Sequence, residues 1–147
     1  MLPFMLEIVV SMTLIQAPPT NAACSLLTPA QVSSLIGAAH TLPVAASPTG
    51  SSCMFQNNDK VITVLVATVS SAEGAQGLFD AKKRIVSGAD VPGWSAPAYA
   101  GFMRPAAVVG VLMKQTLAEV KVVDPSQTPE AITVKLHAVM KDVAARK

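Results

Sequence analysis

Cysteine and histidine are the residue types of this chain with the widest chemical use, and there are two of each: Cys24, Cys53, His40 and His137. A Cys-x-x-Cys redox motif is absent, and no two of these residues have the spacing of a metal-ligand pair. An even number of cysteines behind an apolar leader favours one structural disulfide, formed in an oxidising compartment. The sequence therefore predicts a Cys24–Cys53 disulfide, no metal site and two solvated histidines.

Three other uses of Cys24 stay open on the sequence alone. Cys24 directly follows Ala22-Ala23, as in the cut site of a lipoprotein, although Asn21 stands where a leucine-like residue is expected. An acylated Cys24 could not also pair with Cys53, because both modifications use the same sulfur. The second open use is redox chemistry, and the third is as an N-terminal nucleophile exposed by a cut before Cys24. The disulfide is favoured over all three.

The carboxylates form no pattern that supports acid–base chemistry. Those after Glu7 fall mainly in turns and helix starts, at positions 59, 73, 80, 90, 119, 124, 130 and 142. The nucleophile elbow, the dinucleotide and phosphate-binding glycine motifs and the His-Glu-x-x-His zinc motif are all missing. The sequence therefore predicts no catalytic residue and no cofactor, which is typical of a non-enzymatic protein.

The first 23 residues have the composition of an export leader. An apolar stretch closes in the small residues Asn21-Ala22-Ala23, although it contains no Lys or Arg and carries Glu7. Its apolar run, residues 8–15, is far shorter than the roughly 20 residues of a transmembrane helix. We expect a signal peptide over 1–23, a periplasmic or secreted location, no transmembrane span, and a single domain over 24–147.

Charge is sparse and unevenly distributed. The chain has a formal net charge of +2, and between Glu7 and Asp59 it contains no Asp, Glu, Lys or Arg. The only basic run is 82–84, which is too little for a nucleic-acid-binding face. The apolar fraction of 51% is enough for a packed core, so disorder is not expected. Nucleic acid is therefore excluded as the expected partner.

The helices are defined by their caps and their apolar spacing. Thr28 and Gln31 form a capping box with Pro29 at the first helical position, which predicts a helix over 29–36 that ends at Gly37. A second capping box, at Ser70 and Glu73, predicts a helix over 71–87. A clean apolar stripe predicts a third over 129–145.

The strands follow from runs of β-forming residues, over 53–56, 60–69, 98–103, 106–113 and 116–123. Residues 38–52 are rich in small residues and proline, which predicts a loop with a short extended piece near 41–45. The run 60–69 has β-formers on both faces, as in a central strand covered on both sides. The alternation in 116–123 predicts one wet face and a place nearer an edge. The expected class is α+β, an antiparallel sheet of about five strands flanked by about three helices.

Four motifs occur in the order seen in a known family: Cys-Ser-Leu-Leu-Thr-Pro-Ala-Gln-Val at 24–32, Ser-Cys-Met-Phe at 52–55, Phe-Asp-Ala at 79–81 and Val-Pro-Gly-x-x-x-x-Ala-Tyr at 91–99. The chain resembles the small bacterial secreted or lipid-anchored domains that begin Cys-Ser-Leu-Leu-Thr and are similar in shape to PsbP-like modules. The resemblance implies an antiparallel sheet flanked by helices and pairing of Cys24 with Cys53. It implies no catalytic residue. Trp94, Ser95 and an inserted Pro97 depart from the family's loop.

Trp94 and Tyr99 are the only Trp and Tyr, and they lie close together in and after a Pro/Gly-rich loop at 88–97. Most such residues cap the edge of the core, but exposed aromatic residues also dominate protein contact sites. We therefore expect a non-enzymatic exported module that binds a protein or a cell-envelope component through residues 88–105. One alternative is a small-ligand carrier with a pocket between sheet and helix. Another is a membrane-anchored lipoprotein acylated at Cys24.

Overall fold

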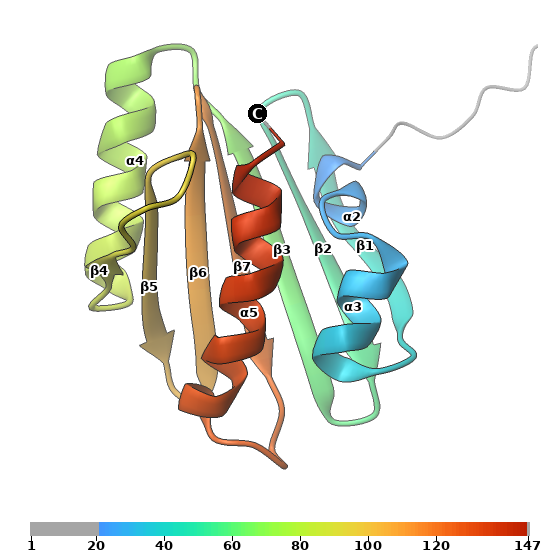
Figure 1. Ribbon diagram of the computed structural model, residues 1–147. Helices are drawn as coiled ribbons and strands as arrows, with labels where there is room; N and C mark the ends of the chain where they lie inside the picture. The colour runs from blue at the N-terminus through green and yellow to red at the C-terminus, as the bar shows by residue number, and fades with distance from the viewer. Residues whose placement is uncertain (1–20, 147) are drawn as a thin grey trace, which may run out of the picture.

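The chain folds around one seven-stranded antiparallel sheet, shown in Figure 1 for a computed structural model that describes residues 21–146. The strands lie in the order β1-β2-β3-β7-β6-β5-β4. They are β1 (His40–Ser47), β2 (Gly50–Asn57), β3 (Lys60–Thr68), β4 (Ala89–Asp90), β5 (Ala98–Met103), β6 (Ala106–Met113) and β7 (Thr116–Val123). The helices are α2 (Ala22–Ser25), α3 (Pro29–Ile36), α4 (Ala72–Ile85) and α5 (Pro129–Ala144). The α+β class is confirmed, with more strands and helices than predicted.

The β1–β2 hairpin accounts for most of the difference. Residues 38–52 were expected to form a loop, but β1 pairs with β2 along its length, and the turn lies at Pro48-Thr49. Pro43 is tolerated because β1 is an edge strand, where a missing N–H need not break a ladder on both sides. The prediction of a loop was therefore wrong, since proline and small residues also suit an edge hairpin.

Two predictions about strand environment also need correction. In β3, Ile62, Val64 and Val66 are buried, but the residues between them are partly exposed, so the strand is covered on one face only. β7 is not near an edge, because it lies between β3 and β6. Its Glu119, which was expected on a wet face, is 2% exposed. A central strand can therefore carry a polar pattern when its polar side chain has a buried partner.

The helices begin close to where their caps predict. Thr28 Oγ1 accepts from the Gln31 N–H, and Gln31 Oε1 accepts from the Thr28 N–H, which confirms the capping box of α3. α4 begins one residue later than predicted, because Ser71 rather than Ser70 caps it by accepting from the Gly74 N–H. No helix within residues 21–146 is both long and apolar enough to cross a membrane.

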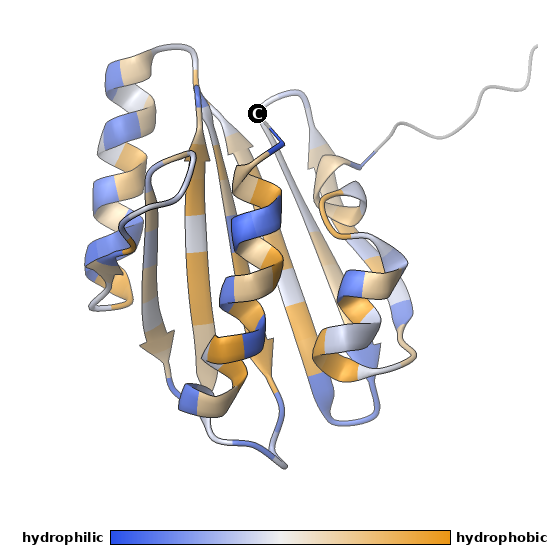
Figure 2. Cartoon of the chain, in the orientation of Figure 1, coloured by the Kyte–Doolittle hydropathy of each residue, from blue (hydrophilic) through white to orange (hydrophobic). Residues whose placement is uncertain are grey.

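Helices cover the two faces of the sheet unequally. The larger core lies between the sheet and α2, α3 and α5. The smaller core lies on the other face, where α4 covers β5, β6 and β7. Figure 2 shows hydrophilic residues along the outer side of α4, as expected for a helix with one buried face. Among the described elements, no helix covers the face of β1, β2 and β3 opposite α3, and we call this face the open face.

The described fold begins before the predicted boundary at Cys24. Asn21 caps α2 by accepting from the N–H groups of Ala23 and Cys24, and its Nδ2 donates to the carbonyls of Ala45 and Ser52. Ala23 is fully buried. Residues 21–23 therefore contribute to the fold, while residues 1–20 of the predicted leader lie outside the described residues and its removal stays a prediction.

Candidate binding surface

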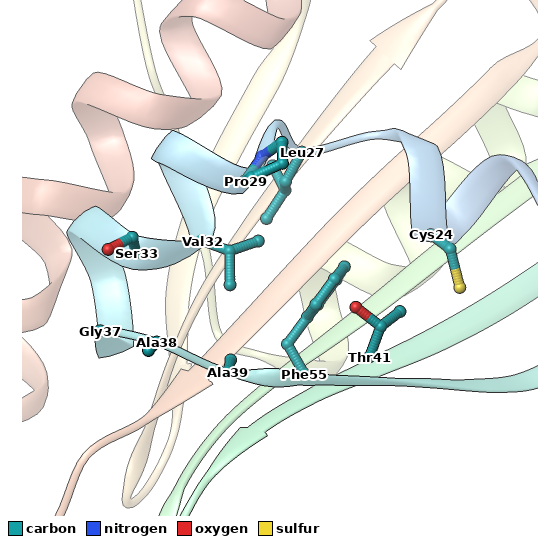
Figure 3. A pocket seen from close by; sticks show the side chains of 10 residues that line it. All are labelled: Cys24, Leu27, Pro29, Val32, Ser33, Gly37, Ala38, Ala39, Thr41 and Phe55. Atoms are coloured by element: carbon teal, nitrogen blue, oxygen red, sulfur yellow. The ribbon is translucent and has the colours of Figure 1, made fainter.

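The first candidate is a half-enclosed groove of about 340 Å³ between α3 and the start of β1. Figure 3 shows the side chains that line it from α3, from the connection to β1 and from the strands below. They are Cys24, Leu27, Pro29, Val32, Ser33, Gly37, Ala38, Ala39, Thr41 and Phe55. The lining is mostly apolar and contains no ionisable side chain, so the groove suits an apolar group.

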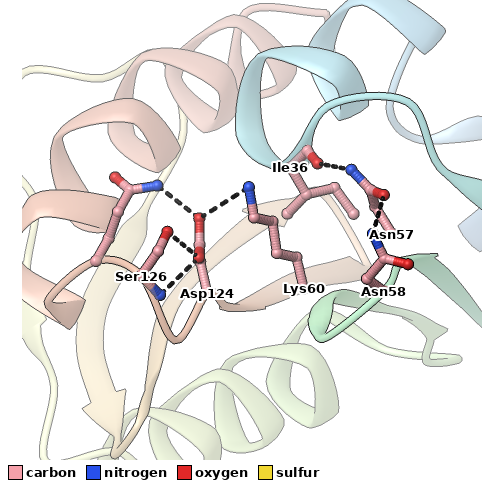
Figure 4. Close-up of polar contacts among 7 residues, drawn as sticks. Ile36, Asn57, Asn58, Lys60, Asp124 and Ser126 are labelled. Carbon is pink, nitrogen blue, oxygen red and sulfur yellow. Dashed lines mark hydrogen bonds and ion pairs between the residues drawn. The ribbon is translucent and has the colours of Figure 1, made fainter.

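Local features hold the walls of this groove in place. Leu27 precedes the cap of α3 and is buried together with Val32, the arrangement of a hydrophobic staple. The helix ends at Gly37, whose φ of 80° favours glycine. The side chain of Asn57, the last residue of β2, donates to the Ile36 carbonyl at 2.7 Å (Figure 4). Both ends of α3 are therefore anchored.

The disulfide joins the groove to the sheet. Cys24 and Cys53 are bonded, with an S–S distance of 2.09 Å and a Cα–Cα distance of 5.1 Å, which confirms the predicted pair. The bridge ties α2 to β2 through two cysteines that are 29 positions apart in the sequence. Closing a loop of this size stabilises a domain by roughly 3–4 kcal/mol. The same bond occupies the sulfur that acylation of Cys24 would need.

Beside the groove, β1 forms a free edge of the sheet. All eight of its residues are exposed, and within residues 21–146 it pairs with β2 alone. Leu42 and Val44 are 43% and 62% exposed, which is unusual for large apolar side chains. The opposite edge, β4, has only two residues. Long unpaired edges are the places where a sheet can accept another strand.

The chain segment that forms the groove and this edge contributes no formally charged side chain. Residues 21–58 form α2, α3, β1 and β2, and none of them is Asp, Glu, Lys or Arg. From α5, Asp142 and Arg146 bond to Gln31 and to the Leu26 carbonyl, neither of which lines the groove. We call residues 21–58 the uncharged side.

The predicted contact loop is only partly accessible. Tyr99 is fully buried, so it belongs to the core and not to an exposed contact, and of the two roles considered for this residue only the one in the core remains. Trp94 is half-buried and packs edge-on against His137, with ring centroids 5.7 Å apart. Burial lowers the pKa of His137, and its Nε2 has no hydrogen-bond partner in the described structure. A contact through Trp94 stays a prediction.

Tyr99 instead belongs to a buried polar pair that the sequence did not reveal. Its hydroxyl donates to the Glu119 carboxylate beneath α4, and its ring meets Phe79 edge-on. Burial raises the pKa of the Tyr99 phenol above its usual range, and the Glu119 carboxylate adds to the effect. Lys121 Nζ lies 3.9 Å from the other Glu119 oxygen. The pair is closed to solvent, so it serves the packing of α4 rather than a ligand.

A second polar cluster lies at the end of β7. Asp124, 3% exposed, accepts from the hydroxyl and N–H of Ser126 and from the Gln127 amide (Figure 4). Lys60 Nζ lies 3.9 Å away. The Ser126 hydroxyl is the main cause of a lowered Asp124 pKa. The partners of Asp124 are its own turn and Lys60 at the start of β3, which makes this a structural cluster.

Neither cluster has the composition of a metal centre. Within residues 21–146, no group of three or more His, Cys, Asp or Glu side chains is placed to hold a metal ion. His40 and His137 lie on different elements, β1 and α5, and the cysteines are bonded to each other. The groove and the edge strand are therefore the features best suited to binding.

Comparisons with known proteins add no family to this description: no family model, no curated protein and no solved structure matches the chain.

Proposed function

We propose that the chain is a non-enzymatic exported module that binds a partner protein through its uncharged side. The observation that carries the proposal is the combination of a long free edge strand, an adjoining apolar groove and the absence of formal charge over residues 21–58. The cores of protein interfaces are depleted of charged residues in the same way. A surface exposed only to water gains nothing from this depletion.

An extracytoplasmic location supports the same proposal. The Cys24–Cys53 disulfide is compatible with an oxidising compartment, periplasmic or extracellular. The intact mass of the exported protein, measured with and without reductant, reports three things at once: the site of any cut, a lipid on Cys24, and the two hydrogens gained on reduction. A mass that includes a lipid on Cys24 would show that this residue is acylated and anchors the chain to a membrane, so that the disulfide does not form.

The test is capture from an envelope extract by the full chain, identification of the captured protein by mass spectrometry, and repetition with the purified partner. Ser33→Lys places a charge in the groove, whereas Ser34→Lys places it one residue further along the same exposed stretch of α3, outside the groove. We expect the partner to be lost with Ser33→Lys and kept with Ser34→Lys. Trp94→Ala tests the loop at 88–105.

The outcomes separate the two surfaces. A partner that is lost with Trp94→Ala but kept with Ser33→Lys would move the contact to the loop and contradict the uncharged side. If no variant differs from the wild-type chain, neither surface binds the captured protein, and the proposal fails.

A small-ligand carrier is the second candidate, favoured by the volume of the groove. About 340 Å³ lies at the lower end of the range for small-molecule pockets, roughly 300–1,000 Å³. Native mass spectrometry of the purified chain tests it directly. A bound small molecule that is present with Ser34→Lys and absent with Ser33→Lys would favour the carrier over the protein-binding module.

A further inference from the structure

We infer that the uncharged side receives an extended, uncharged peptide segment as an additional strand on β1, with one apolar side chain of the segment in the α3 groove. This inference rests on the proposed function and specifies its partner. In such strand addition, main-chain hydrogen bonds supply affinity, and pockets for alternate side chains supply specificity.

The edge is open to pairing where it adjoins the groove. Natural edge strands are protected by charged residues, above all lysine, by proline, and by bulges. β1 has no charged residue apart from the ionisable His40. Its Pro43, and the irregularity in pairing between Pro43 and Ala45, protect the second half of the strand. The first half, residues 40–42, retains its N–H groups and has neither protection.

The register of β1 directs the side chains of an added strand. Thr41 pairs with Phe55, and both line the groove. Leu42 pairs with Met54 on the open face. Since side chains alternate between the two faces of a strand, one side chain of the added segment points toward the groove and the next lies beside Leu42. Both neighbouring surfaces are apolar.

Charge selects the chemistry of the segment. A charged side chain of the partner placed in the groove or beside β1 would lose water and find no opposite charge among the residues of these two features. Beyond the open face, charge begins at β7, where Lys121 pairs with Thr63 of β3. The surface therefore matches an uncharged segment with apolar residues at alternate positions, and it disfavours acidic or basic segments.

The experiment selects ligands for the immobilised full chain from a phage-displayed random heptapeptide library. We expect enrichment of uncharged sequences with alternating apolar residues. The selected peptide is then synthesised in two forms, with free backbone amides and with alternate amides N-methylated on the pairing edge. N-methylation should weaken binding at least about tenfold, because it removes the backbone donors.

Matched variants locate the site. Leu42→Lys and Val44→Lys alter side chains that are 43% and 62% exposed, so both should fold. Met103→Lys and Ile85→Lys, at 41% and 63% exposed, carry the same change elsewhere on the surface. We expect Leu42→Lys, in the unprotected half of β1, to lose affinity at least about tenfold, Val44→Lys, at the irregularity beside Pro43, to lose less, and the two controls to keep it. Unfolding curves confirm that all four remain folded.

Hydrogen exchange reads the binding mode directly. Bound peptide should slow exchange of the amides of residues 40–42. If the captured partner binds but these amides keep their exchange rates, strand addition is refuted while the proposed function stands. If neither partner nor peptide binds, both fail. Analytical ultracentrifugation tests whether the chain forms a dimer through β1 in the absence of peptide. Such a dimer would mean that β1 pairs with a second copy of the chain, and it would overturn the inference.

Discussion

At the scale of single residues, Gly110 determines how α4 packs on the sheet. It lies between Tyr99 and Glu119 in the register of β5, β6 and β7. A Cβ at position 110 would lie 2.2 Å from the Tyr99 ring. The ring therefore crosses the glycine to reach Glu119, and no other residue at 110 leaves room for it.

The first prediction concerns this contact. Gly110→Ala should destabilise the chain by about 1–3 kcal/mol, because the Tyr99 ring must shift and its bond to the buried Glu119 weakens. Gly77→Ala is the matched control. Its added Cβ meets nothing within 4 Å, and it lies within α4, so it should stabilise by about 0.5–1 kcal/mol. Urea unfolding measures both, and equal effects of the two substitutions would contradict this role of Gly110.

The buried pair also shows what single-residue patterns leave out. Glu119 and Lys121 alternate with apolar residues in β7, which predicted a wet face. The partner that makes burial of Glu119 tolerable, Tyr99, lies two strands away in the sheet. The alternation of polar and apolar residues within one strand shows which side chains are polar. It does not show whether another strand supplies a buried hydrogen-bond partner for them.

At the scale of elements, the connection from β7 to α5 depends on one carboxylate. Asp124 accepts three hydrogen bonds from Ser126 and Gln127 and faces Lys60 from the start of β3. The turn that precedes α5 is thus linked to β3, the strand paired with β7. The ionised carboxylate is the stronger acceptor for these bonds and attracts Lys60, so they connect the stability of this turn to pH.

The second prediction follows from the lowered pKa of Asp124. Its ordinary value is 3.8, and the folded value lies below it, so the unfolded chain takes up the proton first as the pH falls. The stabilisation is complete above pH 3.8 and disappears as the pH falls through the folded value. Asp124→Asn should cost about 1–3 kcal/mol at pH 7, and the difference from wild type should shrink below pH 3.8. Thermal unfolding across pH checks this, and a constant difference would exclude the carboxylate as its cause.

The elements also show where prediction from sequence succeeds. β5, β6 and β7 and the helix α3 have the predicted bounds, because their apolar runs and caps are local features. The β1–β2 hairpin was missed, because Pro43, Pro48 and many small residues suit both a loop and an edge. The groove depends on that hairpin, since Thr41 and the connection before β1 form one of its walls. The disulfide was predictable, but the surface beside it was not.

At the scale of the whole molecule, charge is segregated by region. Residues 21–58 carry no formal charge, whereas the elements around the loop at 88–105 carry ion pairs between Lys83 and Asp90 and between Arg104 and Glu130. The part of the sequence without charged residues, between Glu7 and Asp59, therefore corresponds within the described residues to a separate region of the surface. The two candidate contact regions, the uncharged side and the loop, fall on opposite sides of this division.

The third prediction uses this division to identify the contact from solution measurements alone. Binding of the purified partner through the uncharged side should change less than about twofold in affinity between low and high NaCl, because no charge lies within the contact to be screened. Binding through the loop at 88–105 would place Lys83, Asp90, Arg104 or Glu130 at the contact, and its association rate should depend on salt. Titration calorimetry at several NaCl concentrations and constant pH gives the affinity, and stopped-flow mixing gives the rate. If the affinity and the association rate both fall steeply as NaCl rises, binding through the uncharged side is contradicted. This holds even if the β1 variants also weaken binding, because the loss of a contact and the screening of a charge are independent effects.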